Sequence, residues 1–405
     1  MRLAAPFENI ASGVAARTVF PSWPVFDEDE VEAVNAVLRS GRVNYWTGEE
    51  GRRFETEFAG TMGCQYGVAV ANGTVALELA LVALEIRPGE EVIVPCRTFI
   101  ATASAVVMRG AIPVLCDVDP VSQNATVSTI EAALSPRTRA IIVVHLAGWP
   151  CDMDPILALA GKHGLKVIED CAQAHGALYK GRPVGSLGDV GAFSFCQDKI
   201  MTTGGEGGMV ISNDRRLWER AWVYKDHGKS LEALASQKQT VGYRWLHESF
   251  GTNWRLTEIQ AAIGRVQLRK LPNWLAARRA RAATLTVCLR DIPGLRTALP
   301  PEDVRHAYYK FYTFVRPETL KPDWNRDRIL AALLEQGVPV SVGACGDLSR
   351  EKAFYGMTSA SRGQCAVARG LGETSLVFPV YPTLTAQDMM WMGALVKRVL
   401  EQASR

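Results

Sequence analysis

The feature that most constrains the fold of this chain is a series of short, continuously apolar runs separated by helix-like segments. They lie between residues 28 and 270 and include EEVIVP (90–95), AIPVLCDVD (111–119), RAIIVVHL (139–146) and LKVIED (165–170). Because these runs do not alternate between polar and apolar residues, both faces of each strand are expected to be buried. We therefore predict an α/β fold with a mainly parallel central sheet sandwiched by helices.

The pattern changes after about residue 270. An Arg-rich helix is expected over 274–290, and the run YYKFYTFV (308–315) alternates like a partly exposed strand. Further helices are expected over 326–336 and 385–401. The chain is therefore predicted to hold an N-terminal segment (1–27), a large α/β domain (28–270) and a smaller C-terminal α+β domain (271–405).

Composition narrows the class of protein. Apolar residues make up 48% and charged residues 21% of the 405 residues, which is typical of a globular protein. The net charge of +3 argues against nucleic-acid or membrane-surface binding through bulk charge. We find no apolar run of roughly 18 residues, which a membrane-spanning helix needs, and no credible secretion signal. Nine scattered cysteines without a CxxC pair indicate reduced thiols in a cytoplasmic protein, with neither a metal site nor disulfides.

A first candidate site is Asn72-Gly73-Thr74, at the start of an apolar helix. Glycine allows a ligand to approach the backbone closely, and the free N–H groups of a helix N-terminus bind phosphate. A plain glycine turn capped by Asn or Thr is the alternative interpretation.

A second candidate site follows a buried strand, where Glu169 and Asp170 precede Gln173 and His175. Ligands of parallel sheets bind at the carboxyl ends of the strands, so a carboxylate here is well placed to meet one. Asp170 as a helix N-cap is the alternative.

A third candidate is Lys199, which lies a few residues beyond a strand and is followed by two glycine pairs around Glu206. Most lysines are solvated surface groups, but so many glycines are costly in entropy. A partly buried lysine amine can form a Schiff base.

Together these three sites supply what pyridoxal phosphate needs. A helix N-terminus takes the phosphate, a carboxylate keeps the pyridine nitrogen protonated, and a lysine holds the aldehyde as an imine and moves the proton. Phe99, just after the strand at 90–95, is a candidate for stacking on the ring.

At this point the sequence resembles the DegT/StrS family of pyridoxal-phosphate-dependent aminotransferases, which act mostly on nucleotide-linked keto-sugars. The resemblance covers nearly the whole chain. It rests on NGTVALELAL, EEVIVPCRTFIATASAV, VVHLAGWPCDMD, KVIEDCAQAHGA, GSLGDVGAFSF, GGEGGMV and GTNWRLTEIQAAIG, which occur in that order.

The resemblance implies a fold-type-I homodimer with shared active sites, and it implies a role for each matching residue. Lys199 would form the imine, Asp170 would pair with the pyridine nitrogen, and Gln173 would contact the phenolic oxygen. Phe99 would stack on the ring. The phosphate would be held by Gly73, Thr74 and Ser194, and by Asn253 of the neighbouring subunit. Four further residues are candidates for contacts near the cofactor or the substrate, namely His175, Tyr45, Trp46 and Arg255.

The expected activity is transfer of an amino group from glutamate or glutamine to a nucleotide-linked keto-sugar, for an amino sugar of a surface polysaccharide or a glycosylated metabolite. Members of the wider family with His in place of Lys199 catalyse dehydration, so the lysine favours transamination. Two alternatives stay open. The acceptor is a keto-cyclitol or a related ring, or the chain is a non-catalytic regulatory protein that binds the cofactor.

Overall fold

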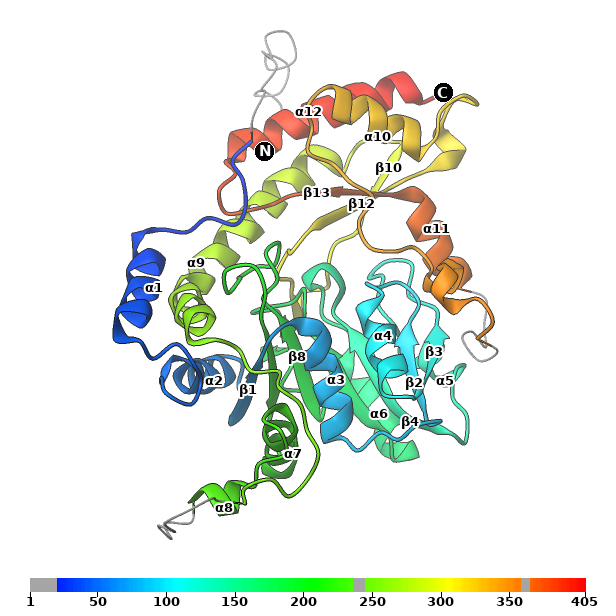
Figure 1. Cartoon of the computed structure of the whole chain (residues 1–405). Helices are drawn as coiled ribbons and strands as arrows, with labels where there is room; N and C mark the ends of the chain where they lie inside the picture. The colour runs from blue at the N-terminus through cyan, green and yellow to red at the C-terminus, as the bar shows by residue number, and fades with distance from the viewer. Residues whose placement is uncertain (1–19, 236–244, 358–364) are drawn as a thin grey trace.

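The computed structural model describes residues 20–235, 245–357 and 365–405 (Figure 1). Its centre is a seven-stranded sheet. In spatial order the strands are β1 (Tyr66–Val70), β9 (Gly208–Ser212), β8 (Val190–Ser194), β5 (Lys166–Asp170), β4 (Thr138–Val144), β2 (Glu91–Pro95) and β3 (Ile112–Cys116). The five strands from β8 to β3 are parallel to one another, and β9 is antiparallel to both of its neighbours. The predicted mainly parallel sheet is confirmed.

Helices cover both faces of this sheet, and neighbouring strand residues enter different cores. Ile142 of β4 packs with one hydrophobic cluster, whereas Ile141 and Val143 pack with another on the opposite face. One face is covered by α3 (Gly73–Ala83), α4 (Ala101–Met108) and α7 (Arg215–Lys225), and the other by α2 (Glu50–Thr61), α5 (Val127–Glu131), α6 (Met153–His163) and the first part of α9 (Glu258–Leu289). Burial on both faces explains why the strands lack polar alternation.

The predicted N-terminal helix is α1 (Glu28–Ser40). Asp27 and Glu30 form a capping box at its start, and Gly41 ends it in the left-handed conformation, with a φ of 67°. The sequence pattern did not reveal α2, which lies in the next segment and packs against α9.

The C-terminal part is built on a three-stranded antiparallel sheet of β10 (Leu295–Thr297), β12 (Phe311–Val315) and β13 (Ser375–Phe378). Its helices are α10 (Arg326–Glu335), α11 (Ala366–Thr374) and α12 (Ala386–Ala403). The expectation that the strand within 308–315 is partly exposed is wrong, because every residue of β12 is buried. Phe311 and Val315 pack in a core shared with α10 and α12, and Tyr312 and Phe314 pack in a core shared with the seven-stranded sheet.

Helix α9 joins the two parts of the chain. It runs without interruption through residue 270, from α1 and α2 at one end to α12 at the other (Figure 1). A division of the chain at 270 therefore passes through a continuous helix, and the two-domain description stays a prediction. The short elements are α8 (Leu231–Ala235) and a small sheet of β6 (Leu178–Tyr179), β7 (Arg182–Pro183) and β11 (Val304–Arg305). Among the described residues, every helix is too short or too polar to cross a bilayer.

Candidate active site

A cleft of about 600 Å³ opens at the carboxyl ends of the parallel strands. Val144, Asp170 and Ser194, which end β4, β5 and β8, form part of its floor. Seven of the residues predicted from the sequence line this one cleft, namely Gly73, Thr74, Phe99, Asp170, Gln173, Ser194 and Lys199. The chain segments that carry them are far apart in the sequence, and the sheet topology brings them together.

The N-terminus of α3 forms a tight backbone cradle at one end of the cleft. Asn72 caps the helix by accepting a hydrogen bond from the Val75 amide at 3.0 Å. A Cβ on Gly73 would lie 2.5 Å from the Cβ of Ser194, so only glycine fits there. The helix N-terminus and the Ser194 hydroxyl face the cleft together and suit a phosphate group.

Asp170 is a buried carboxylate that accepts two hydrogen bonds. The Thr102 hydroxyl donates to its Oδ2 at 2.9 Å, and the Ala172 amide donates to its Oδ1 at 3.1 Å. Burial raises the pKa of Asp170, while these two donors act in the opposite direction. Within the described part of the chain, Asp170 forms no ion pair with a lysine or arginine. A ligand with a protonated ring nitrogen would supply the missing cation.

Lys199 reaches the cleft from the loop after β8. Its Nζ lies 3.4 Å from Oδ1 of Asp198 and 5.1 Å from the centre of the Tyr309 ring. Its backbone is held by its own amide, which donates to the Cys196 carbonyl at 3.0 Å, and by Trp23, whose indole N–H donates to the Lys199 carbonyl at 2.7 Å. The side chain is only 16% exposed, so its amine is held in place and partly shielded from water.

Two further predicted residues present groups to the cleft. Phe99 is 66% exposed, which is unusual for a phenylalanine beside a buried strand and leaves its ring free to stack. The Oε1 of Gln173 accepts a hydrogen bond from the Ala147 amide at 2.8 Å. That bond orients the side chain so that its N–H₂ group can donate to a ligand oxygen.

The histidines near the site do not line the cleft. His145 is fully buried, bonds to Glu169 through Nε2 at 2.9 Å, and accepts the Cys151 amide at Nδ1. Both of its ring nitrogens therefore have protein partners, so it is a satisfied structural histidine. His175 lies behind the cleft wall between aromatic rings, and burial lowers its pKa to about 3.

The other predicted residues gather elsewhere, around the buried Asp226. Its Oδ1 accepts the Trp46 indole N–H at 3.3 Å and pairs with Arg255 at 2.9 Å. Tyr45 is buried nearby and donates to Glu55 at 3.0 Å. Asn253 is exposed and does not line the cleft of its own chain.

The sequence analysis missed several residues of the cleft. Thr102 lies one helical turn after Phe99, a spacing that could have indicated it. Tyr309, Lys310 and Tyr312 come from the C-terminal part of the chain. No motif marked them, because a lysine or tyrosine beside a strand is common in any protein.

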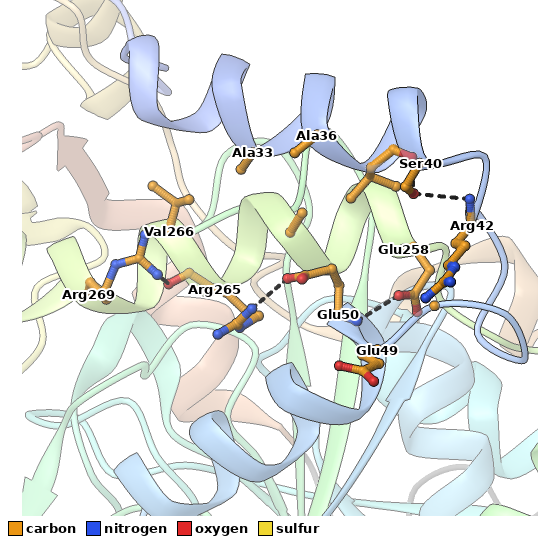
Figure 2. Close-up of a pocket in the computed structure, with 13 residues that line it drawn as sticks. Ala33, Ala36, Ser40, Arg42, Glu49, Glu50, Glu258, Arg265, Val266 and Arg269 are labelled. Carbon is orange, nitrogen blue, oxygen red and sulfur yellow. Dashed lines mark hydrogen bonds and ion pairs between the residues drawn. The ribbon is translucent and has the colours of Figure 1, made fainter.

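A second cavity, of about 360 Å³, lies between α1, α2 and α9 (Figure 2). Four of the charged residues that line it already have protein partners, namely Glu49, Glu50, Glu258 and Arg265. Glu258 accepts the backbone amides of Glu50 and Gly51 at 2.6 and 3.0 Å, and Arg265 pairs with Glu50 and Glu57. Figure 2 shows Glu50 between Glu258 and Arg265, with dashed lines to both.

The fold and the cleft define a class of enzyme, the pyridoxal-phosphate-dependent aminotransferases with a mainly parallel sheet. Residues 24–396 match the DegT/DnrJ/EryC1/StrS aminotransferase family, so the chain belongs to that family. The class predicted from the sequence is thereby confirmed.

Individual relatives agree with this membership. The chain is 40% identical over 355 residues, or 87% of its length and 89% of the relative, to a UDP-N-acetyl-3-dehydro-α-D-glucosamine 3-aminotransferase from Acidithiobacillus ferrooxidans. It is 39% identical over 335 residues, 80% of its length and 77% of the relative, to a putative L-glutamine:3-amino-2,3-dideoxy-scyllo-inosose aminotransferase from Streptoalloteichus tenebrarius. The crystal structure of an aminotransferase from Psychrobacter cryohalolentis superposes with a TM-score of 0.93 at 51% identity, covering 95% of this chain and 100% of that one.

Proposed function

We propose that this enzyme moves an amino group from glutamate or glutamine to a nucleotide-linked keto-sugar, with pyridoxal phosphate held in the cleft described above. One observation carries the proposal. A buried carboxylate that forms no ion pair within the described residues and a shielded lysine amine face one cleft, at the end of which a glycine cradle suits a phosphate.

The residues fit the cofactor group by group. The N-terminus of α3 and Ser194 would hold the phosphate, Phe99 would stack on the ring, and Gln173 would donate to the phenolic oxygen. Asp170 would pair with the ring nitrogen. When bound, pyridoxal phosphate supplies an aldehyde that condenses with amines and a ring that accepts electrons.

The protein's own groups then orient the reacting atoms and move the proton. Asp170, fixed by Thr102 and the Ala172 amide, would keep a positive charge on the ring nitrogen. Lys199 would hold the cofactor aldehyde and would carry the proton that leaves the donor's α-carbon. The Lys199 main chain is held at both its N–H and its carbonyl, which would keep the amine within reach of that carbon.

The acceptor is proposed from the relatives. The name of the Acidithiobacillus relative specifies a UDP-linked 3-keto sugar, which supports a nucleotide-linked sugar here. The name of the Streptoalloteichus relative specifies a keto-cyclitol, and this keeps a cyclitol as the second candidate. An amino sugar made in this way would enter a surface polysaccharide or a glycosylated metabolite.

A homodimer with shared active sites and a cytoplasmic location remain parts of the proposal. The position of Asn253 supports the dimer, because it is exposed and lies outside its own cleft, where a neighbouring subunit could receive it. Three further predicted residues lie near Asp226, namely Tyr45, Trp46 and Arg255. They would contribute to the same interface between subunits.

The test is a panel of nucleotide-linked keto-sugars and keto-inositols, each incubated with the loaded enzyme and ¹⁵N-labelled glutamate or glutamine and read by mass spectrometry. We expect ¹⁵N in a nucleotide-linked amino sugar. Label only in an inositol product would favour the cyclitol alternative. Label in no product, with an intact visible absorption band, would favour a regulatory protein.

A further inference from the structure

Lys310 is a positive charge in the cleft that the proposed chemistry does not yet use. It precedes β12 and lines the cleft beside Tyr309 and Tyr312. The side chain is partly buried, and this burial lowers the pKa of Lys310. A desolvated ammonium group is costly unless an anion accompanies it.

The described residues provide no carboxylate within ion-pair distance of Lys310. The acidic residue of the cleft whose charge acts on Lys310 is Asp198, which accepts a hydrogen bond from the hydroxyl of Tyr309 and pairs with Lys199 at 3.4 Å. The nitrogen of Lys310 instead lies 5.0 Å from the centre of the Tyr309 ring. The nitrogen of Lys199 lies 5.1 Å from the same centre, so both amines are close to the Tyr309 ring.

The anions of the cofactor and of a nucleotide are poor candidates to fill this place. The cofactor phosphate fits the N-terminus of α3, which is formed by a different part of the cleft. The diphosphate of a nucleotide sugar is attached to C1, which is separated from a keto carbon at C3 or C4 by at least one ring carbon. The anion closest to the reacting nitrogen belongs to the amino donor, whose α-carboxylate is bonded to the carbon that carries that nitrogen.

We propose that Lys310 binds a carboxylate of the amino donor. The inference rests on the proposed function, since it requires that glutamate or glutamine enters this cleft. An ammonium–carboxylate contact in a partly desolvated cleft would fix the donor for reaction at Lys199 and would also satisfy the charge of Lys310.

The experiment compares Lys310→Met with Lys310→Arg, and uses Lys162→Met on the exposed surface of α6 as a control for the loss of one positive charge. L-Glutamate and L-glutamine are titrated against each loaded enzyme, and the change of the visible absorption band is followed. Calorimetry with glutarate, which has the carboxylates but no amine, gives a binding readout that is independent of turnover. Calorimetry with UDP and with GDP reports on the nucleotide end, and circular dichroism reports on folding.

We expect Lys310→Met to weaken donor binding by about 10- to 100-fold, with Lys310→Arg recovering much of it and Lys162→Met unchanged. Nucleotide binding should be the same in all variants. Equal losses for glutamate and glutamine would assign the α-carboxylate, and a loss for glutamate alone would assign the side-chain carboxylate.

Donor affinity equal to wild type in Lys310→Met would overturn the assignment, as would weakened nucleotide binding with normal donor binding. If Lys310→Met misfolds, Lys310→Gln is measured in its place by the same criteria. If neither glutamate nor glutamine changed the visible absorption band of the loaded wild-type enzyme, the proposed function would be wrong, and the assignment of Lys310 would fall with it.

Discussion

The two cavities of this protein differ in how their charges are satisfied. In the cavity between α1, α2 and α9, Glu258 is bonded to two backbone amides and Arg265 to two carboxylates. In the cleft at the strand ends, Asp170 and Lys310 form no ion pair within the described residues, and Phe99 is open to solvent. The first cavity holds a structure together, whereas the second leaves groups for a ligand.

The comparison teaches that volume alone does not identify an active site. Both cavities are large enough for a small molecule and both contain several charged residues. The difference lies in the partners of those residues. A buried polar group without a protein partner is costly, so its presence indicates a ligand that completes it.

The largest effect is expected when the reacting amine is removed. Lys199→Ala should lower turnover by about 10³-fold or more, since it removes both the covalent attachment point and the proton carrier. Amination of the accepted sugar is measured by mass spectrometry. Arg269→Ala, in the other cavity, is the matched control and should turn over like wild type. Equal loss in both variants would erase the functional distinction between the cavities.

A pair of glycine variants compares the two cavities for packing. In Gly73→Ala the new Cβ would lie 2.5 Å from Ser194, and in Gly48→Ala it would lie 2.1 Å from the Oε2 of Glu258. Both should destabilise the fold by about 1–3 kcal/mol. Only Gly73→Ala should also weaken retention of pyridoxal phosphate, by about 10-fold. Dialysis with absorbance readout measures retention. If Gly73→Ala kept the cofactor as firmly as wild type, the assignment of the α3 N-terminus as the phosphate site would be wrong.

Glu258 tests whether the smaller cavity is structural. Glu258→Ala leaves the amides of Glu50 and Gly51 at the start of α2 without their acceptor, which should cost about 1–3 kcal/mol of unfolding free energy. Glu49→Ala, at an exposed neighbouring position, should change stability by less than about 0.5 kcal/mol. Urea unfolding measures both. A stable Glu258→Ala enzyme with reduced turnover would contradict a purely structural role.

The smallest expected effect is a change in the pH dependence of stability that comes from the protonation of His175, which is buried behind the cleft wall. His175 has a pKa of about 3 in the folded chain, so between pH 6.5 and 3 the unfolded chain binds the extra proton and stability falls as the pH falls. The expected slope from this residue is about 1.4 kcal/mol per pH unit. His175→Phe should therefore lose less stability than wild type between pH 6.5 and 5, as measured by urea unfolding. If the free energy of unfolding fell equally with pH in the two proteins, the folded and unfolded chains would not differ in the protonation of His175.

Part of the cleft was predictable because local chemistry marks it. Gly73 has to be glycine for a close backbone approach, Asp170 ends a strand of apolar character, and Lys199 is followed a few residues later by two glycine pairs. Each signal lies within a few residues of the functional group. The same reasoning found the buried strands, since the absence of polar alternation is a local property of each run.

The sequence by itself determined the mainly parallel sheet, the class of enzyme and seven of the residues that line the cleft. Only the tertiary structure decided that Lys310 reaches the same cleft, that His175 lies behind its wall and that both faces of β12 are buried. The physical reason is that these outcomes depend on tertiary packing. The packing of the C-terminal part against the large sheet places Lys310 and β12, and the rings of Phe58, Phe193 and Phe195 enclose His175. Contacts between segments more than a hundred residues apart leave no periodic or compositional trace in either segment.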